Sequence, residues 1–204
     1  MYRKICAFSG HRSSKFPWKY DETDMRCVKL KAALAERIAS LVDRDGVTDI
    51  LVGGAEGADT WAALTVLSLR EKNSALRLHC ILPCQGQSDS WSASARERYQ
   101  EILNRADSVF YMQREYSEGC MLERNRFMVD HADMLLAVYN GEWRGGTAAT
   151  VRYAKKAGKY TLILDSSARK HPFPSFPGRL SVKNGDIVNS HAVSGSTMNE
   201  TQGF

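Results

Sequence analysis

Residues 48–72 have the sequence TDILVGGAEGADTWAALTVLSLREK. The first five residues, 48–52, are rich in β-branched and apolar types, which is typical of a short strand. The last thirteen, 60–72, have the composition of a helix. Between them, residues 53–59 contain three glycines. Strand, glycine-rich loop and helix in this order are typical of parallel sheets, where the carboxyl end of a strand leads into a helix. The stretch predicts an α/β fold.

The same succession recurs on both sides of this stretch. Further strands are expected at residues 3–9, 76–82, 108–111, 134–139 and 160–164, and further helices at residues 25–42, 91–105, 121–131 and 147–157. Because apolar strands alternate with amphipathic helices, the sequence predicts a Rossmann-like, doubly wound, mostly parallel sheet with helices on both faces. This domain is expected to span residues 1–165. Residues 166–204 hold three of the five prolines and no apolar periodicity, so we expect a loosely ordered tail.

Composition narrows the class of protein and its partners. The 204 residues are 43% hydrophobic and 25% charged, as in globular proteins. No apolar run approaches the roughly 20 residues of a membrane helix, and the first residues do not form a signal peptide, so we expect a cytoplasmic protein. The net charge of +5 is dispersed along the chain. A positive net charge suits a phosphorylated small ligand as well as nucleic acid, and its dispersal along the chain argues against a nucleic-acid partner.

The five cysteines are an odd number without paired spacing. We therefore expect reduced, buried thiols and no disulfide framework. His79, Cys80 and Cys84 lie close together in sequence, but no second ligand pair stands at zinc-site spacing. The sequence predicts neither a metal site nor a cofactor.

Two glycine loops are the strongest candidates for a ligand site. Gly53-Gly54 and Gly145-Gly146-Thr147 each follow a predicted strand and precede a predicted helix. Glycine lets backbone N–H groups approach a ligand, and a helix N-terminus adds unpaired donors, so phosphate suits such a loop. Neither loop has the Walker A or the GxGxxG spacing, which disfavours ATP hydrolysis and standard NAD binding. Tight turns without any ligand are the alternative explanation for these glycines.

Three further segments supply candidate residues. Arg12, after the first strand, is suited to pairing with phosphate. Asp59 stands where a carboxylate caps helix N–H groups, which is its default role. Arg124 lies early in the helix before the fifth strand, where a solvated surface position is the ordinary alternative. The predicted ligand-binding set, which contains no catalytic residue, is Ser9, Gly10, His11, Arg12, Gly53, Gly54, Ala55, Glu56, Asp59, Arg124, Asn125, Gly145, Gly146 and Thr147.

These motifs, taken in order, resemble the YpsA-like proteins of the SLOG superfamily. The resemblance runs from Ile5 to about Leu164. It implies a Rossmann-like fold and a nucleotide-type ligand. The superfamily includes the Smf/DprA DNA-binding proteins, the Lonely guy phosphoribohydrolases and proteins regarded as sensors of nucleotide-derived signals. The matching motifs are Ser9-Gly10-His11-Arg12, Gly53 to Asp59, Trp61-Ala62-Ala63, Arg98-Tyr99, Gly119-Cys120-Met121, Arg124-Asn125, and Tyr139 with Gly145-Gly146-Thr147.

The chain departs from the phosphoribohydrolase branch at one place that matters for catalysis. That branch has a Met-x-x-Arg helix and a Pro-Gly-Gly-x-Gly-Thr-x-x-Glu loop, and Met121, Arg124 and Thr147 fall in matching places. The proline is absent, however, and Ala148-Ala149-Thr150 occupy the stretch of the glutamate. The YpsA-like pattern also commonly has Glu after Trp-Ala-Ala, where this chain has Leu64.

The sequence thus leaves three functions open. The leading hypothesis is a protein that binds or senses a nucleotide-derived, phosphate-bearing small molecule, with a homodimer possible. The first alternative is an N-glycosidic nucleotide hydrolase, in which Glu56, or less favourably Glu142, replaces the missing carboxylate. The second alternative is a single-stranded DNA binder, which would need a basic groove with aromatic platforms.

Overall fold

Six parallel strands form one central sheet in the computed structural model, which describes residues 3–167. Their spatial order is β4-β3-β2-β1-β5-β6, and every neighbouring pair is parallel. The predicted α/β, Rossmann-like class is confirmed. The strands are β1 (Ile5–Gly10), β2 (Asp49–Val52), β3 (Arg77–Leu82), β4 (Ser108–Tyr111), β5 (Met134–Tyr139) and β6 (Tyr160–Asp165).

Five α-helices alternate with the strands, and a short 3-10 turn, η1 (Ser13–Lys15), follows β1. Each predicted helix and strand is present, with ends that differ from the prediction by at most two residues. The apolar period of the sequence therefore located every element. The helices are α1 (Met25–Asp43), α2 (Ala58–Arg70), α3 (Ala93–Arg105), α4 (Cys120–Asp130) and α5 (Gly146–Lys156).

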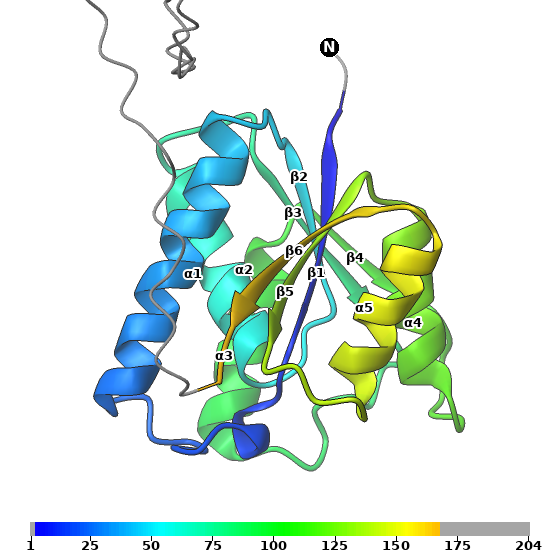
Figure 1. Cartoon of the computed structure of the whole chain (residues 1–204). Coiled ribbons are helices and arrows are strands. Elements are labelled where there is room, and N and C mark those ends of the chain that lie inside the picture. The colour runs from blue at the N-terminus through cyan, green and yellow to red at the C-terminus, as the bar shows by residue number, and fades with distance from the viewer. Residues whose placement is uncertain (1–2, 168–204) are drawn as a thin grey trace, which may run out of the picture. The chain divides into compact units, whose positions relative to one another are not determined.

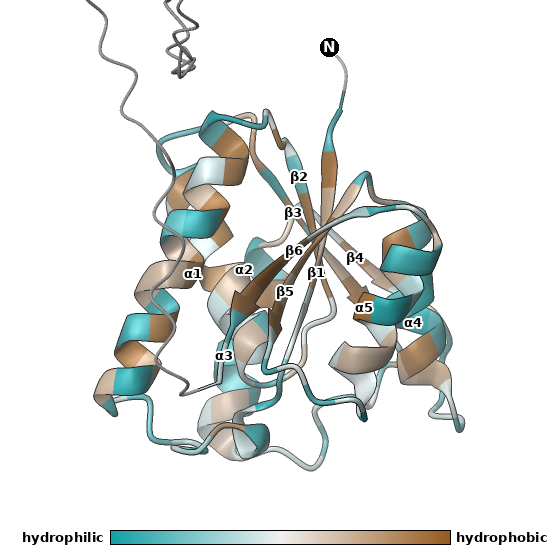
Figure 2. Cartoon of the chain, viewed as in Figure 1, coloured by the Kyte–Doolittle hydropathy of each residue, from teal (hydrophilic) through white to brown (hydrophobic). Residues whose placement is uncertain are grey.

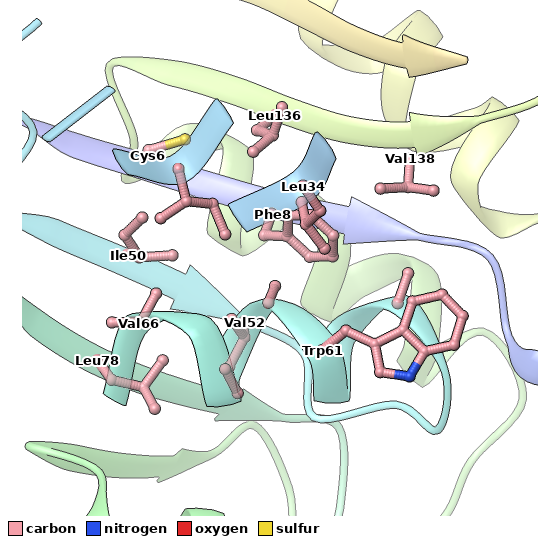
Figure 3. Packing of buried hydrophobic residues seen from close by; sticks show 14 of the residues in the cluster. Cys6, Phe8, Leu34, Ile50, Val52, Trp61, Val66, Leu78, Leu136 and Val138 are labelled. Atoms are coloured by element: carbon pink, nitrogen blue, oxygen red, sulfur yellow. The ribbon is translucent and has the colours of Figure 1, made fainter. Parts of the chain in front are cut away.

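Successive residues of each strand point to opposite faces of the sheet, which creates two apolar layers. Phe8 and Ile50 pack on the side of α1, α2 and α3, whereas Ala7, Leu51 and Leu135 pack against α4 and α5. Figure 2 shows the apolar strands between helices whose outer surfaces are polar. Figure 3 shows part of the larger layer, where Leu34 of α1 lies over Phe8 of β1.

The edge of the sheet is less covered than the sequence suggested. All four residues of β4 are exposed, and Phe110 is 48% exposed. The strands β1, β2 and β5, in contrast, are almost wholly buried. Coverage on both faces is therefore a property of the central strands. β4 is the outermost strand of its side and is only partly covered, with Phe110 stacked on Phe127 of α4.

The direction of winding reverses between β1 and β5. From β1 to β4 each new strand is added on the same side, and β5 then pairs with the free side of β1. As a result, the loop after β1 leads towards α1 and the loop after β5 leads towards α5, on the other face of the sheet (Figure 1). Diverging loops leave a crevice at the carboxyl ends of the two strands, which is where open α/β sheets bind ligands.

Three further predictions concern the chain as a whole. All five cysteines are buried and free, as expected. No helix within residues 3–167 is long and apolar enough to cross a membrane. The predicted tail begins at residue 166, and everything after Ser167 falls outside the described residues. The division into a domain of residues 1–165 and a tail stays a prediction.

Candidate functional site

A cavity of about 170 Å³ lies where the loops after β1 and β5 diverge, and we call it the switch-point cavity. Eleven of the fourteen predicted site residues line it; the exceptions are Gly53, Gly54 and Glu56. Segments far apart in sequence thus meet at one place. The lining residues are Phe8, Ser9, Gly10, His11, Arg12, Lys15, Ala55, Asp59, Met121, Arg124, Asn125, Glu142, Arg144, Gly145, Gly146 and Thr147.

Arg124 forms part of the floor of this cavity and is only 5% exposed. One terminal nitrogen, Nη1, donates to the carbonyl oxygens of Gly53 and Ile81, the latter at 3.1 Å. Its Nε donates to Oδ1 of Asn125 at 2.9 Å. The backbone of two strand ends therefore fixes this guanidinium, which is anchored rather than solvated as a surface arginine would be.

The two glycines Gly53 and Gly54 lie against buried side chains and do not line the switch-point cavity, and their contact with a ligand stays a prediction. A Cβ built on Gly53 would overlap the guanidinium of Arg124. A Cβ on Gly54 would press against Leu82, and the Gly54 carbonyl accepts a hydrogen bond from Gln87 at 2.8 Å. The glycine pair is needed because buried side chains approach the backbone closely here, so it shapes the site without lining it.

Asp59 is the buried carboxylate of the site, at 5% exposure. Its Oδ2 accepts a hydrogen bond from the Ala55 amide at 3.3 Å, so it holds the loop before α2 instead of capping the helix itself. Burial raises the pKa of Asp59, and the attraction of Arg124 opposes this shift only in part. Burial likewise lowers the pKa of Arg124, against the attraction of Asp59. The two groups partly stabilise each other's charge without forming an ion pair within 4 Å among the described residues.

The rim of the cavity carries four exposed charged side chains, Arg12, Lys15, Arg144 and Glu142. None of them forms an ion pair with another residue of the described range 3–167. Lys15 and Arg144 were not among the predicted site residues. Their position directly after the first and fifth strands was the signal that pointed to them, since such loops border the crevice of this fold.

The N-terminus of α5 opens onto the same cavity. Its N-cap residue, Gly145, has a φ of +110°, which favours glycine, and no side chain of the described residues caps the helix. A Cβ added to Gly146 would meet no atom of residues 3–167 within 4 Å, so its backbone lies open. Uncapped N–H groups at the positive end of a helix dipole are suited to binding an anion. This glycine loop therefore matches the prediction in its geometry.

Two hydrogen bonds hold the elements of the site together. His11, 8% exposed, shares a 2.9 Å hydrogen bond between its Nε2 and Oδ1 of Asn140, which joins the loops after β1 and β5. Burial lowers the pKa of His11, which favours the neutral form of its ring. Asn125 donates to the hydroxyl of Thr150 at 2.8 Å and so ties α4 to α5. Thr150, in the stretch where the phosphoribohydrolases have glutamate, is thus a packing residue.

Glu56 faces a second, larger cavity of about 390 Å³, which we call the acidic cavity. The turn η1 and the loop of residues 53–57 separate it from the switch-point cavity, because Ser13, Glu56 and Gly57 face one cavity while Lys15 and Ala55 face the other. The acidic cavity is lined by Ser13, Tyr20, Asp21, Glu22, Thr23, Glu56, Gly57, Thr60, Trp91, Ser92, Ser94, Ala95 and Arg98.

Comparison with known proteins assigns the chain to a family. The model of the YpsA family, described as the YspA SLOG family, matches residues 6–164. The chain belongs to this family. The UPF0398 protein of Bacillus pumilus (strain SAFR-032) is 31% identical over 163 residues, which cover 78% of this chain and 86% of that protein. The UPF0398 protein RBAM_020340 of Bacillus velezensis is 29% identical over 170 residues, with 79% and 92% covered.

A solved structure supports the YpsA-family fold. DNA processing protein A from Helicobacter pylori, described with a single-stranded DNA binding mode, superposes with a TM-score of 0.53 at 19% identity. The match covers 78% of this chain, which spans about 64% of the length of that chain. The likeness concerns the fold. Three of the motifs that suggested the YpsA family, Ser9-Gly10-His11-Arg12, Arg124-Asn125 and Gly145-Gly146-Thr147, line the switch-point cavity. Arg98 of the Arg98-Tyr99 motif lines the acidic cavity instead.

Proposed function

We propose that the protein binds a nucleotide-derived small molecule and holds its phosphate groups in the switch-point cavity. The observation that carries this proposal is the charge of the lining. Four cations, Arg12, Lys15, Arg124 and Arg144, line the cavity against two carboxylates, Asp59 and Glu142. Asp59 is buried and already hydrogen-bonded to the loop, so the solvent-facing charge is positive.

The arrangement of the donors supports phosphate over other anions. The cavity combines the uncapped N-terminus of α5 with the guanidinium groups of Arg12, Arg124 and Arg144, and a tetrahedral dianion uses several such donors at once. Arg124 is fixed by two backbone carbonyls, so little conformational entropy is lost when a ligand binds. Membership of the SLOG family supports a nucleotide-derived ligand, because the superfamily includes proteins that act on nucleotides.

The test is calorimetric titration of the full chain with AMP, ADP and ADP-ribose. In the matched pair Arg144→Ala and Arg77→Ala, each variant loses one exposed arginine, but Arg77 begins β3 at the opposite end of the sheet. We expect Arg144→Ala to weaken binding about tenfold, as for a charge-assisted hydrogen bond, and Arg77→Ala to leave it unchanged. Equal losses in both variants, or no binding by wild type, would contradict the proposal.

A second candidate function, N-glycosidic hydrolysis, is favoured by the position of Glu142. Among the described residues, Glu142 is the exposed carboxylate that lines the switch-point cavity, whereas Glu56, the substitute that the sequence favoured, faces the acidic cavity. A carboxylate beside a bound nucleotide is able to activate water. The test is chromatography of AMP, GMP, CMP and UMP after incubation with wild type and with Glu142→Gln. Base release by wild type that Glu142→Gln abolishes would make this chain an enzyme.

Single-stranded DNA is the remaining alternative, because the superposed DNA processing protein is described as binding it. A DNA-binding mode depends on many phosphate contacts, so its affinity falls steeply with salt. We expect a labelled oligonucleotide to bind this protein more weakly than ADP-ribose at physiological salt. Tighter binding of the oligonucleotide, with no heat of binding for the three nucleotides, would reverse the preference.

A further inference from the structure

The acidic cavity is more than twice as large as the switch-point cavity, and the proposed phosphate site makes no use of it. Sites for small molecules commonly measure roughly 300–1,000 Å³. The switch-point cavity, at about 170 Å³, is below this range, while the acidic cavity, at about 390 Å³, lies within it. A phosphate-bearing ligand that fills the smaller cavity therefore leaves much of itself to be bound elsewhere.

The two cavities share one thin wall. Gly57 packs so closely on η1 that an added Cβ would overlap the Ser13 amide, and the Ala58 amide donates to the His11 carbonyl at 3.1 Å. Arg12 and Lys15 face the switch-point cavity, whereas Ser13 between them faces the acidic cavity. A single extended molecule that crosses this turn reaches both cavities.

Two of the three carboxylates in the acidic cavity are already occupied by the protein. Glu22 accepts hydrogen bonds from Lys31, Trp61 and Arg98, at 2.6, 3.0 and 2.8 Å. Asp21 accepts from the amide and the hydroxyl of its neighbour Thr23, at 3.0 and 2.6 Å. These hydrogen bonds fix Asp21 and Glu22 in the wall of the cavity. The third carboxylate is the one whose acceptor oxygens have no partner yet described.

Glu56 is that third carboxylate. It is half-buried, and its side chain has no hydrogen bond or ion pair within the part of the chain that the structure describes. Its position is fixed between Ala55 and Gly57, in a loop that Asp59 and Arg124 hold rigidly. A half-buried carboxylate with free acceptor capacity on a rigid loop is ready to accept hydrogen bonds from a ligand.

The remaining lining indicates what kind of group fits. Six hydroxyl side chains surround the cavity, and two aromatic rings, Tyr20 and Trp91, stand at its border. Hydroxyls and a carboxylate form hydrogen bonds with the hydroxyl groups of a sugar, and aromatic rings cover its apolar C–H face. Three carboxylates against one arginine, Arg98, leave the lining net negative, which disfavours a second phosphate. The hydroxyl-bearing lining residues are Ser13, Tyr20, Thr23, Thr60, Ser92 and Ser94.

We propose that the acidic cavity binds an uncharged sugar at the far end of the same ligand whose phosphates lie in the switch-point cavity, with Glu56 accepting from the sugar hydroxyls. The ligand class is then a nucleoside diphosphate that carries a terminal sugar. This inference rests on the proposed function, because the sugar is placed relative to bound phosphate.

The experiment measures the ratio of the affinities for ADP-ribose and ADP, which differ by the terminal ribose. The full chain is titrated with each probe, as wild type, as Glu56→Ala and as Glu97→Ala. Glu97 is an exposed carboxylate of α3 that lines neither cavity. We expect wild type and Glu97→Ala to bind ADP-ribose at least about tenfold more tightly than ADP, and Glu56→Ala to bring this ratio close to one.

The outcomes separate this inference from the proposed function. If wild type binds ADP and ADP-ribose equally, the sugar assignment is wrong while phosphate binding stands. If Glu56→Ala weakens both probes to the same degree, the acidic cavity holds a part common to both, and the terminal sugar is not what it binds. If neither probe binds, both proposals fail.

Discussion

Buried charged side chains at the two ends of the sheet differ in whether an oppositely charged partner lies beside them. At the amino end, Asp49 is 1% exposed and its carboxylate is enclosed by donors from three strands or their approaches. Arg3 donates to both oxygens, the Thr48 hydroxyl donates at 2.6 Å, and Nε2 of His79 lies at 2.8 Å. At the carboxyl end, buried Arg124 has carbonyl and amide oxygens as partners and no carboxylate within ion-pair distance among the described residues.

The difference distinguishes charged groups whose partners lie within the fold from the charged groups to which we assign ligand binding. Burial would raise the pKa of Asp49, but its hydrogen bonds with Arg3, Thr48 and His79 outweigh burial and hold the pKa far below its usual range. The chain therefore satisfies this charge by itself. Around the switch-point cavity the rim cations have no such partners in the described chain, and a group left unpaired there is available to an external anion.

The largest loss of stability is expected when the hydrogen-bond network around Asp49 is broken. Asp49→Ala removes the acceptor shared by three donors, so we expect the free energy of unfolding to fall by about 3 kcal/mol. Urea denaturation measures this change. Asp45→Ala, which removes an exposed carboxylate from the loop before β2, is the control and should cost less than about 0.5 kcal/mol. A loss of ADP affinity in a folded Asp49→Ala protein would show that the two ends are coupled.

A single methyl group at Gly53 should damage both stability and binding. Gly53→Ala forces the Arg124 guanidinium out of its place, and such overpacking costs about 1–3 kcal/mol. Because the displaced guanidinium no longer faces the cavity, we also expect ADP binding to be lost in calorimetry. Gly146→Ala is the matched substitution for stability alone, since no atom of residues 3–167 lies near its added methyl and the residue is helical. Its ADP binding is not compared, because Gly146 lines the proposed phosphate site. If Gly53→Ala binds ADP normally, Arg124 does not act in binding.

Glu22 tests whether hydrogen-bond partners within the fold, rather than position along the sheet, distinguish the charged groups that stabilise the protein from the unpaired ones. It lies near the carboxyl end, yet Lys31, Trp61 and Arg98 all donate to it. Burial raises the pKa of Glu22, but these hydrogen bonds outweigh it and lower the pKa to about 2. We expect Glu22→Gln to reduce the free energy of unfolding by about 1–2 kcal/mol at pH 7, as a satisfied network requires.

The stabilisation by Glu22 depends on pH, and the direction of this dependence follows from its lowered pKa. Because the folded pKa lies below the ordinary value of 4.5, the stabilisation is complete above pH 4.5 and is lost as the pH falls towards about 2. The difference between wild type and Glu22→Gln, measured by urea denaturation across this range, should therefore shrink in acid. A difference that stays constant with pH would mean that the charge of Glu22 does not contribute.

The sequence predicted the fold nearly completely and the site only in part. Strand and helix positions follow from apolar period, which a single chain displays directly. The glycines after β1 and β5 and Arg12 were identified because such residues stand out in loops, but Lys15 and Arg144 in the same loops were missed. The functions of Gly53 and Glu56 were not predictable, because they depend on which long-range neighbour fills the space beside them: Arg124, 71 residues away, for the first and the wall of a separate cavity for the second.

The smallest stability effect is expected at the rim, and its sign is informative. Arg12, Lys15 and Arg144 line one cavity without ion pairs among residues 3–167, and the charge of Lys15 contributes to the lowered pKa of His11, after burial. Like charges held near each other repel, so Arg144→Ala should raise the free energy of unfolding of the ligand-free protein, by no more than about 0.5 kcal/mol.

The gain in stability of Arg144→Ala should disappear in high salt, since the repulsion is screened. In saturating ADP the variant should become less stable than wild type, because it binds the ligand more weakly. Urea denaturation at two ionic strengths, with and without ADP, measures all four values, and Arg77→Ala should show neither change. If Arg144→Ala instead destabilises the ligand-free protein, Arg144 has a partner within the fold. The claim that unpaired rim cations distinguish the carboxyl end of the sheet from the amino end would then be wrong.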